Sequence, residues 1–197
     1  MSDTRFAWAA SILIIVAWGF DASGAHAQSG EADIGEVAGS AGVASGGGIG
    51  AQAFVSGGVG LAFSRYGMGL IETSFLPLGQ QTIQPWPAPF TVNHSYLLDF
   101  AFNIHIRIPV KHRWAPYAIV GTGLLWDLVQ QRTTDSTGVT TVRGYNQFNG
   151  VLNTGGGLRY YFGQKWGIRP EVKVLVSKQV YTCVSVGVFY VIPANWP

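Results

Sequence analysis

The alternating stretch L-D-F-A-F-N-I-H-I-R-I, residues 98–108, constrains this chain more than any other part of its sequence. One parity carries only leucine, phenylalanine and isoleucine. The other carries polar and small residues, namely Asp99, Ala101, Asn103, His105 and Arg107. Because neighbouring side chains of a β-strand point to opposite faces, this strand has one wholly apolar face and one polar face. A soluble sheet also alternates, but so long an apolar face opposite charged residues is typical of a transmembrane β-strand of about 9–11 residues.

The same pattern returns near the end of the chain. In residues 168–176, apolar side chains and Pro170 alternate with Arg169, Glu171, Lys173 and Leu175. Charged residues make up only 11% of the chain, against about 25% in ordinary soluble domains. No acidic or basic run indicates a nucleic-acid partner. Cys183 is the only cysteine, so no internal disulfide is expected.

The first 27 residues are predicted to be a cleavable export signal. Arg5 precedes an apolar segment, residues 6–18, and Ala25-His26-Ala27 supplies the small-x-small cleavage pattern. The alternative is an N-terminal anchor helix, but the apolar run is shorter than the roughly 20 residues that span a bilayer. We therefore expect a signal peptide at 1–27 and one domain at 28–197.

The mature chain is predicted to fold as an all-β, eight-stranded antiparallel up-and-down transmembrane barrel. An open sheet edge in lipid would leave backbone groups unpaired, so the strands must close into a ring. Glycine runs such as 155–157 suit a narrow, strongly bent barrel. Pro170 removes a ladder donor and predicts a β-bulge. The predicted strands are Ile34–Val43, Gln52–Phe63, Met68–Phe75, His94–Ile108, Ala115–Leu128, Gln147–Phe162, Gly167–Ser177 and Tyr181–Ile192.

The connections between these strands alternate in length. Residues 76–93 and 129–146 are predicted to be long polar loops outside the cell, with Trp86 and Phe90 as exposed candidates for contact with a surface partner. The tight turns on the opposite side each carry a basic–aromatic pair. These pairs are Arg65-Tyr66, Arg113-Trp114 and Lys165-Trp166. A ring beside a cation suits the headgroup level of a membrane, so outer-membrane lipid is the expected surrounding.

By parity, acids and bases point into the lumen in nearly equal numbers. A narrow lumen is partly desolvated, so we expect these charges to pair into a structural network that plugs the barrel. An open selective pore would instead carry an excess of one sign, although a narrow small-solute pore stays an alternative. The predicted lumen residues are Glu36, Glu72, Asp99, His105, Arg107, Asp127, Arg159, Arg169, Glu171 and Lys173.

Catalysis is not expected. His94 and Ser95 are neighbours in a predicted strand and therefore point to opposite faces, so they cannot form a Ser–His pair directly. The histidines of the mature chain are too scattered for a metal site, and the glycine runs lack the lysine and context of a phosphate loop. We expect no cofactor and no metal.

The second half of the chain resembles the small bacterial outer-membrane β-barrel proteins, the porin-like or outer-membrane protein A-type superfamily. The resemblance rests on residues 153–162 and 166–173, on Trp114-Ala115-Pro116-Tyr117, on Gly121-Thr122-Gly123 and on Gly187-Val188-Phe189-Tyr190. It implies the eight-stranded fold and an outer-membrane location but no single activity, because members include anchors, adhesins and narrow pores. From the residues themselves we expect a non-catalytic structural or surface-interaction role. Members commonly end on an aromatic residue, whereas this chain continues past Tyr190 to Pro197. A soluble periplasmic ligand-binding barrel is the remaining alternative.

Overall fold

The computed structural model describes residues 33–47, 49–82, 90–108, 113–163 and 165–193, so the predicted signal peptide lies outside the described residues. The described chain forms strands joined by turns. The strands are β1 (Asp33–Gly46), β2 (Ile49–Ala62), β3 (Gly67–Thr82), β4 (Phe90–Arg107), β5 (Trp114–Thr134), β6 (Thr140–Tyr161), β7 (Trp166–Val176) and β8 (Val180–Pro193). Within the described ranges, no helix is long and apolar enough to cross a membrane.

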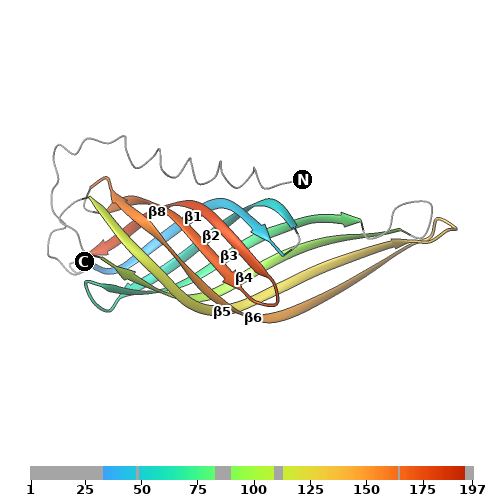
Figure 1. Ribbon diagram of the computed structural model, residues 1–197, viewed down its shortest axis with the longest axis horizontal. Coiled ribbons are helices and arrows are strands. Elements are labelled where there is room, and N and C mark those ends of the chain that lie inside the picture. Colours follow the sequence, from blue (N-terminus) through green and yellow to red (C-terminus); the bar gives the residue numbers. More distant parts are fainter. Residues whose placement is uncertain (1–32, 48, 83–89, 109–112, 164, 194–197) are drawn as a thin grey trace, which may run out of the picture.

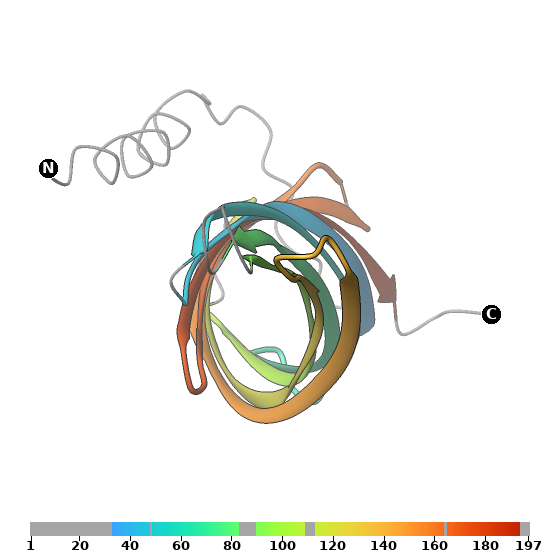
Figure 2. The ribbon, with the colours of Figure 1, turned by 90° about the vertical axis from the view of Figure 1, so that its right-hand side faces the viewer.

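The strands close into one antiparallel ring in chain order (Figure 2). Each strand pairs with its neighbours in sequence, and β1 completes the ring by pairing with β8, for example Val37 with Tyr190. Closure leaves no strand of the ring with an open edge along the wall, as a lipid environment requires. The predicted eight-stranded up-and-down barrel is confirmed.

The alternation in β4 has the expected consequence. Phe102 and Ile106 are about half exposed on the outer wall, at 50% and 51%, whereas Asn103 and His105 are fully buried in the lumen. Corresponding apolar residues on the other strands complete an apolar belt around the barrel. The belt includes Val37, Val55, Val59, Ile71, Phe100, Phe102, Val120, Leu124, Leu152, Val186 and Val188.

Charged side chains are excluded from this belt. Among the described residues, the exposed charged side chains lie in turns or at the far end of the long strands, namely Arg65, Arg132, Asp135, Arg143, Lys165 and Lys178. At the end of the tight turns, here called the turn end, aromatic rings pair across strands. The ring centroids of Trp114 and Tyr160 are 4.6 Å apart, and those of Trp166 and Tyr190 are 4.9 Å apart. This is the arrangement of an interfacial aromatic girdle.

The prediction of two long loops is wrong for most of the residues concerned. Strand β3 continues to Thr82, β4 begins at Phe90, β5 continues to Thr134 and β6 begins at Thr140. Trp86 lies outside the described residues, as does the side chain of Phe90. The segments are polar on both faces and therefore lack the one-sided pattern of a membrane strand. Their backbones nevertheless pair with one another. Strand β4 pairs with β5 as far as Phe90–Thr134, and β5 pairs with β6 as far as Thr134–Thr140.

These long strands form a sheet that rises beyond the rest of the barrel (Figure 1). The β2–β3 pairing ends at Val55–Phe75, and the β6–β7 pairing ends at Leu152–Val176. Beyond those points β3, β4, β5 and β6 continue as a four-stranded antiparallel sheet, here called the hairpin sheet, at the hairpin end of the barrel. Its two outer strands, β3 and β6, are paired on one side only.

Pro170 does not create the predicted bulge. The register between β6 and β7 is the same on both sides of it, with Gly157 opposite Glu171 and Tyr160 opposite Ile168. The missing donor is accommodated by a local gap in this ladder, while Pro170 keeps its place opposite Val186 of β8. Pro77 does lie at an irregularity, where the register of β3 against β4 shifts.

Candidate functional site

The lumen of the barrel holds a set of paired charges, here called the lumen network: Glu36, Glu72, Glu171, Arg159, Arg169 and Lys173. Arg169 of β7 lies between two carboxylates, with nitrogen–oxygen distances of 3.2 Å to Glu36 and 2.9 Å to Glu72. Arg159 of β6 forms a second contact to Glu36 at 2.5 Å. All six residues are buried, so each charge depends on its partners in place of water.

Lys173 extends the network toward the hairpin end. Its ammonium contacts Glu72 at 2.9 Å and Glu171, on its own strand, at 3.3 Å. Because side chains two residues apart on a strand share a face, Arg169, Glu171 and Lys173 all project inward from β7. The sequence alternation alone therefore places three of the six charges in the lumen.

Neutral polar groups complete the network. Tyr117 donates a hydrogen bond of 2.7 Å to Glu171, and Asn103 donates one to Glu72. Asn153 in turn donates to Asn103 at 3.0 Å. None of these three residues was among the predicted lumen residues, although Asn103 and Asn153 lie on the inward parity of their strands. Tyr117 was missed because an aromatic residue near a strand end suits the lipid face equally well.

Glycine makes room for Tyr117 on the lumen wall. A Cβ atom at Gly157 would lie 2.7 Å from the Tyr117 hydroxyl oxygen and 2.4 Å from the Pro170 carbonyl oxygen. The glycine at this position of the 155–157 run therefore allows the close approach that brings the Tyr117 hydroxyl to Glu171. On the other side of the ring, His105 stacks on Tyr117 with centroids 4.9 Å apart.

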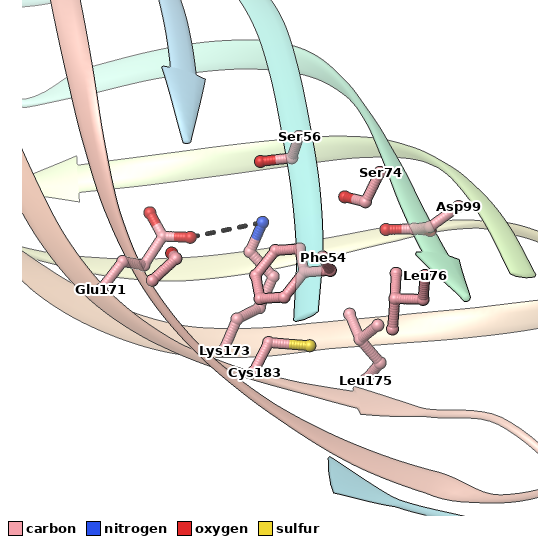
Figure 3. A pocket seen from close by; sticks show the side chains of 10 residues that line it. Phe54, Ser56, Ser74, Leu76, Asp99, Glu171, Lys173, Leu175 and Cys183 are labelled. Carbon is pink, nitrogen blue, oxygen red and sulfur yellow. Dashed lines mark ion pairs between the residues drawn. The ribbon is translucent and has the colours of Figure 1, made fainter. Parts of the chain in front are cut away.

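Two other predicted lumen residues, Arg107 and Asp99, are also buried. Arg107 is buried at the end of β4. Asp99 is also buried but has no ion pair within the described chain. It lines a small hollow together with Ser56, Ser74 and Lys173, as Figure 3 shows. This hollow has room for about one water molecule, and one Asp99 carboxylate oxygen has no protein partner there.

Apolar side chains close the lumen on both sides of the network. Toward the hairpin end lies a cluster that includes Phe54, Leu76, Leu97, Leu125 and Leu175. Toward the turn end lies a second cluster, in which Tyr161 and Phe189 pack edge to face with centroids 5.1 Å apart. With charges paired between two apolar layers, the described lumen is a packed interior.

Asp127 occupies a different place from the other predicted lumen residues. It is only partly buried and lies above the apolar layer, where it lines an open hollow at the hairpin end, here called the mouth pocket. The pocket has a volume of about 110 Å³ and is open to solvent. Parity predicts an inward Asp127, but it does not reveal how far along the barrel axis the side chain lies.

The described residues show no site for metal chemistry. No group of three or more His, Cys, Asp or Glu side chains within them is arranged to hold a metal ion. Cys183 is buried beside Leu175 in the apolar layer and is a free thiol. His94 and Ser95 are consecutive in β4, and the side chain of His94 lies outside the described part of the chain.

Comparison with known proteins gives matches in structure only. No protein-family model matches the sequence, and no curated protein sequence matches it. A major outer membrane protein from Thermus thermophilus matches 80% of this chain and 99% of its own, with 9% identity and a TM-score of 0.55. Neisserial surface protein A matches 82% of this chain and 99% of its own, with 13% identity and a TM-score of 0.52.

The closed ring, the uncharged outer belt and these likenesses define the class of the protein. It has the fold of the small eight-stranded β-barrels of bacterial outer membranes. The belt is a lipid-facing surface, since an apolar exterior around a charged interior is the reverse of what a soluble barrel requires. The outer membrane of a bacterium is the location that this surface fits.

Proposed function

We propose that the protein is a non-catalytic outer-membrane barrel that makes contacts at the cell surface through its hairpin sheet. In this proposal the hairpin end faces outward and the turn end faces the periplasm. The short turns and the longer hairpins lie at opposite ends, which is the usual plan of bacterial outer-membrane barrels. The paired lumen supports a closed barrel that serves as a rigid membrane anchor for the sheet above it.

The observation that carries the proposal is the unpaired edge of β6. Residues 140–149 pair with β5 on one side and have no strand on the other, and every described side chain from 140 to 148 is exposed. Only at Gly150 does the hydroxyl of Ser177 cap a carbonyl of this strand, at 2.7 Å. A row of free backbone donors and acceptors is a template on which an extended segment of another protein can add a strand.

Apolar groups near this edge add contact area. Val142 and Phe148 project from the outer face of β6 and are 58% and 62% exposed. The Phe148 ring stacks on Trp126 with centroids 5.3 Å apart, so it is held in place before any partner arrives. Alternate side chains along an added strand would find these groups, which is how strand addition gains specificity.

A shortened variant tests this role without altering the barrel. Gln130 and Gly144 are directly paired, so residues 131–143 can be replaced by Asn-Gly, a two-residue turn that suits a hairpin. Parent and variant are reconstituted in lipid nanodiscs and offered to surfaces coated with extracellular-matrix and serum proteins. We expect saturable binding by the parent and at least a tenfold weaker binding by the variant.

The control is the folded state of the barrel. Both proteins should show the mobility change on heating that marks a closed outer-membrane barrel on gels. Equal binding by a folded shortened variant would contradict a role for the sheet. Absence of saturable binding by the parent to every surface would contradict a surface-interaction function.

A further inference from the structure

The mouth pocket lies between the apolar layer and the base of the hairpin sheet. Its floor is formed by Leu97 and Leu125, which also belong to the apolar layer beneath. Its walls carry Asp127 of β5 and Gln147 and Asn149 of β6. Asp127 and Gln147 face each other directly across the two strands. The pocket thus combines an apolar base with polar groups that converge from adjacent strands, which is the usual make-up of a small-molecule site.

The polar groups of the pocket have unused hydrogen-bonding capacity. One carboxylate oxygen of Asp127 is buried and has no partner in the described chain. Tyr181, which also lines the pocket, donates a 2.7 Å hydrogen bond to the amide oxygen of Gln179. A buried acceptor without a partner is costly unless water or a ligand supplies a donor.

The chemistry of these groups selects a class of ligand. A side-chain amide offers a donor and an acceptor together, and a carboxylate accepts up to several hydrogen bonds. Neighbouring hydroxyl groups of a sugar, each of which donates and accepts hydrogen bonds, match these amide and carboxylate groups. The apolar C–H face of the sugar ring matches the leucine floor. The pocket is lined by one carboxylate, Asp127, and one ammonium group, Lys178, so it has no excess of positive charge that would select a sulfated or phosphorylated ligand.

The inner face of the hairpin sheet continues this surface outward. Above the Asp127–Gln147 pair come Val129 opposite Tyr145 and then Gln131 opposite Arg143, all on the same face. Tyr145 is 53% exposed, so its ring is free to lie against a ligand. A chain of linked sugar units entering the pocket would pass directly over this aromatic and polar strip.

We propose that the mouth pocket is a binding site for a neutral sugar residue, held by Asp127, Gln147 and Asn149 over the Leu97–Leu125 floor. The inner face around Tyr145 then contacts the next units of an oligosaccharide. The sugar could be supplied by a soluble glycan or by the sugar part of a surface lipid, because both present the same hydroxyl chemistry. This site uses inward-facing side chains of β6, whereas the proposed surface contact uses the backbone edge and the outer face of the same strand.

Ligand titration of the purified barrel tests the proposal. The protein, refolded in detergent without lipopolysaccharide, is titrated with methyl hexosides and neutral disaccharides, and binding is followed by saturation-transfer NMR and calorimetry. Asp127→Asn should weaken binding about tenfold, because a charge-assisted hydrogen bond to a carboxylate becomes a weaker one to a neutral amide oxygen. Gln147→Ala should weaken it as well, whereas the matched control Asp135→Asn, at the tip of the hairpin, should leave it unchanged.

Repeating the titration with lipopolysaccharide vesicles distinguishes the source of the sugar. Competition between vesicles and free disaccharide points to the lipid-linked glycan, and absence of competition points to a soluble one. The proposal is overturned if no neutral saccharide binds at millimolar concentration. It is also overturned if binding survives both Asp127→Asn and Gln147→Ala, or if only a sulfated disaccharide or a zwitterion such as glycine betaine binds.

Discussion

Arg169 and Glu72 form an ion pair of 2.9 Å between β7 and β3, which stand directly opposite each other in the eight-stranded ring. Lys173 of β7 reaches the same carboxylate at 2.9 Å. The lumen network therefore links opposite walls, in addition to the backbone ladders that link neighbouring strands. A charge at the centre of such a network has no water to replace a lost partner.

Removing Glu72 should destabilise the barrel strongly. Its carboxylate contacts Arg169, Lys173 and Asn103, so Glu72→Ala leaves two buried cations short of a partner. We expect the free energy of unfolding to fall by about 3–5 kcal/mol. Urea titration in lipid vesicles, with the folded fraction read on gels, measures it. The control is Thr73→Ala, because Thr73 follows Glu72 in β3 and its side chain lies on the outer face. An equal effect of the two substitutions would argue against the network.

The outer belt predicts a depth-dependent cost for charge. Phe102 lies in the middle of the apolar face of β4 and is 50% exposed. Phe102→Arg should therefore cost about 2–4 kcal/mol of folding free energy in a bilayer. The comparison is Phe148→Arg, at 62% exposure on the hairpin sheet, where the cost should be about 0–1 kcal/mol. Similar costs at both positions would mean that Phe102 does not face lipid.

The orientation of the barrel can be read from cysteine labelling. Cys183 is buried, so the parent should react little with a membrane-impermeant maleimide. Ser136→Cys, in the turn between β5 and β6, should be labelled on intact cells. Ser64→Cys, in the turn between β2 and β3, should be labelled only after the outer membrane is permeabilised. The opposite pattern would place the hairpin end in the periplasm.

The tip of the hairpin should respond to acid. Asp135 accepts hydrogen bonds from the Thr137 hydroxyl at 2.6 Å and from the amides of Thr137 and Val139 at 2.9 Å. These bonds, that of the Thr137 hydroxyl foremost, lower the pKa of Asp135 below its ordinary 3.8. The ordering they give the tip is therefore present at neutral pH and is lost as the pH falls through the lowered pKa.

Solution NMR of the barrel in nanodiscs checks this pH dependence. The carboxyl resonance of Asp135 should titrate with a midpoint below 3.8, and Asp135→Asn should speed amide exchange at Thr137 and Val139. A midpoint at or above the ordinary value would show that the hydrogen bonds at the tip do not form in solution.

The sequence predicts the barrel well because its strongest physical signal is local. Alternation along residues 98–108 determines which side chains face lipid, and closure follows from the cost of an open edge in lipid. The same alternation places Arg169, Glu171 and Lys173 inward. It does not tell which charge meets which, because Glu72 and Arg169 come together only through the order and shear of the strands.

The hairpin sheet could not be predicted by the same reasoning. A strand that extends beyond the membrane meets water on both faces and needs no apolar face. Residues 129–134 and 140–146 therefore lack the alternation that predicts a membrane strand, and their sequence is typical of a loop. The bulge predicted at Pro170 is wrong for a related reason. The strand accommodates the proline by a gap of two positions in one ladder, and such a gap leaves no trace in the sequence pattern. The mouth pocket could not be predicted either, because alternation does not tell how far along the barrel axis Asp127 lies.

The most direct test of a closed, charge-bridged lumen is the ionic current through the protein. The purified parent is inserted into a planar bilayer after gels have shown that its barrel is folded. With charged residues paired between two apolar layers, we predict no steady conductance above that of the bare bilayer, and brief openings in Glu72→Ala. A steady ohmic conductance through the parent would contradict the closed lumen and would make the protein a pore.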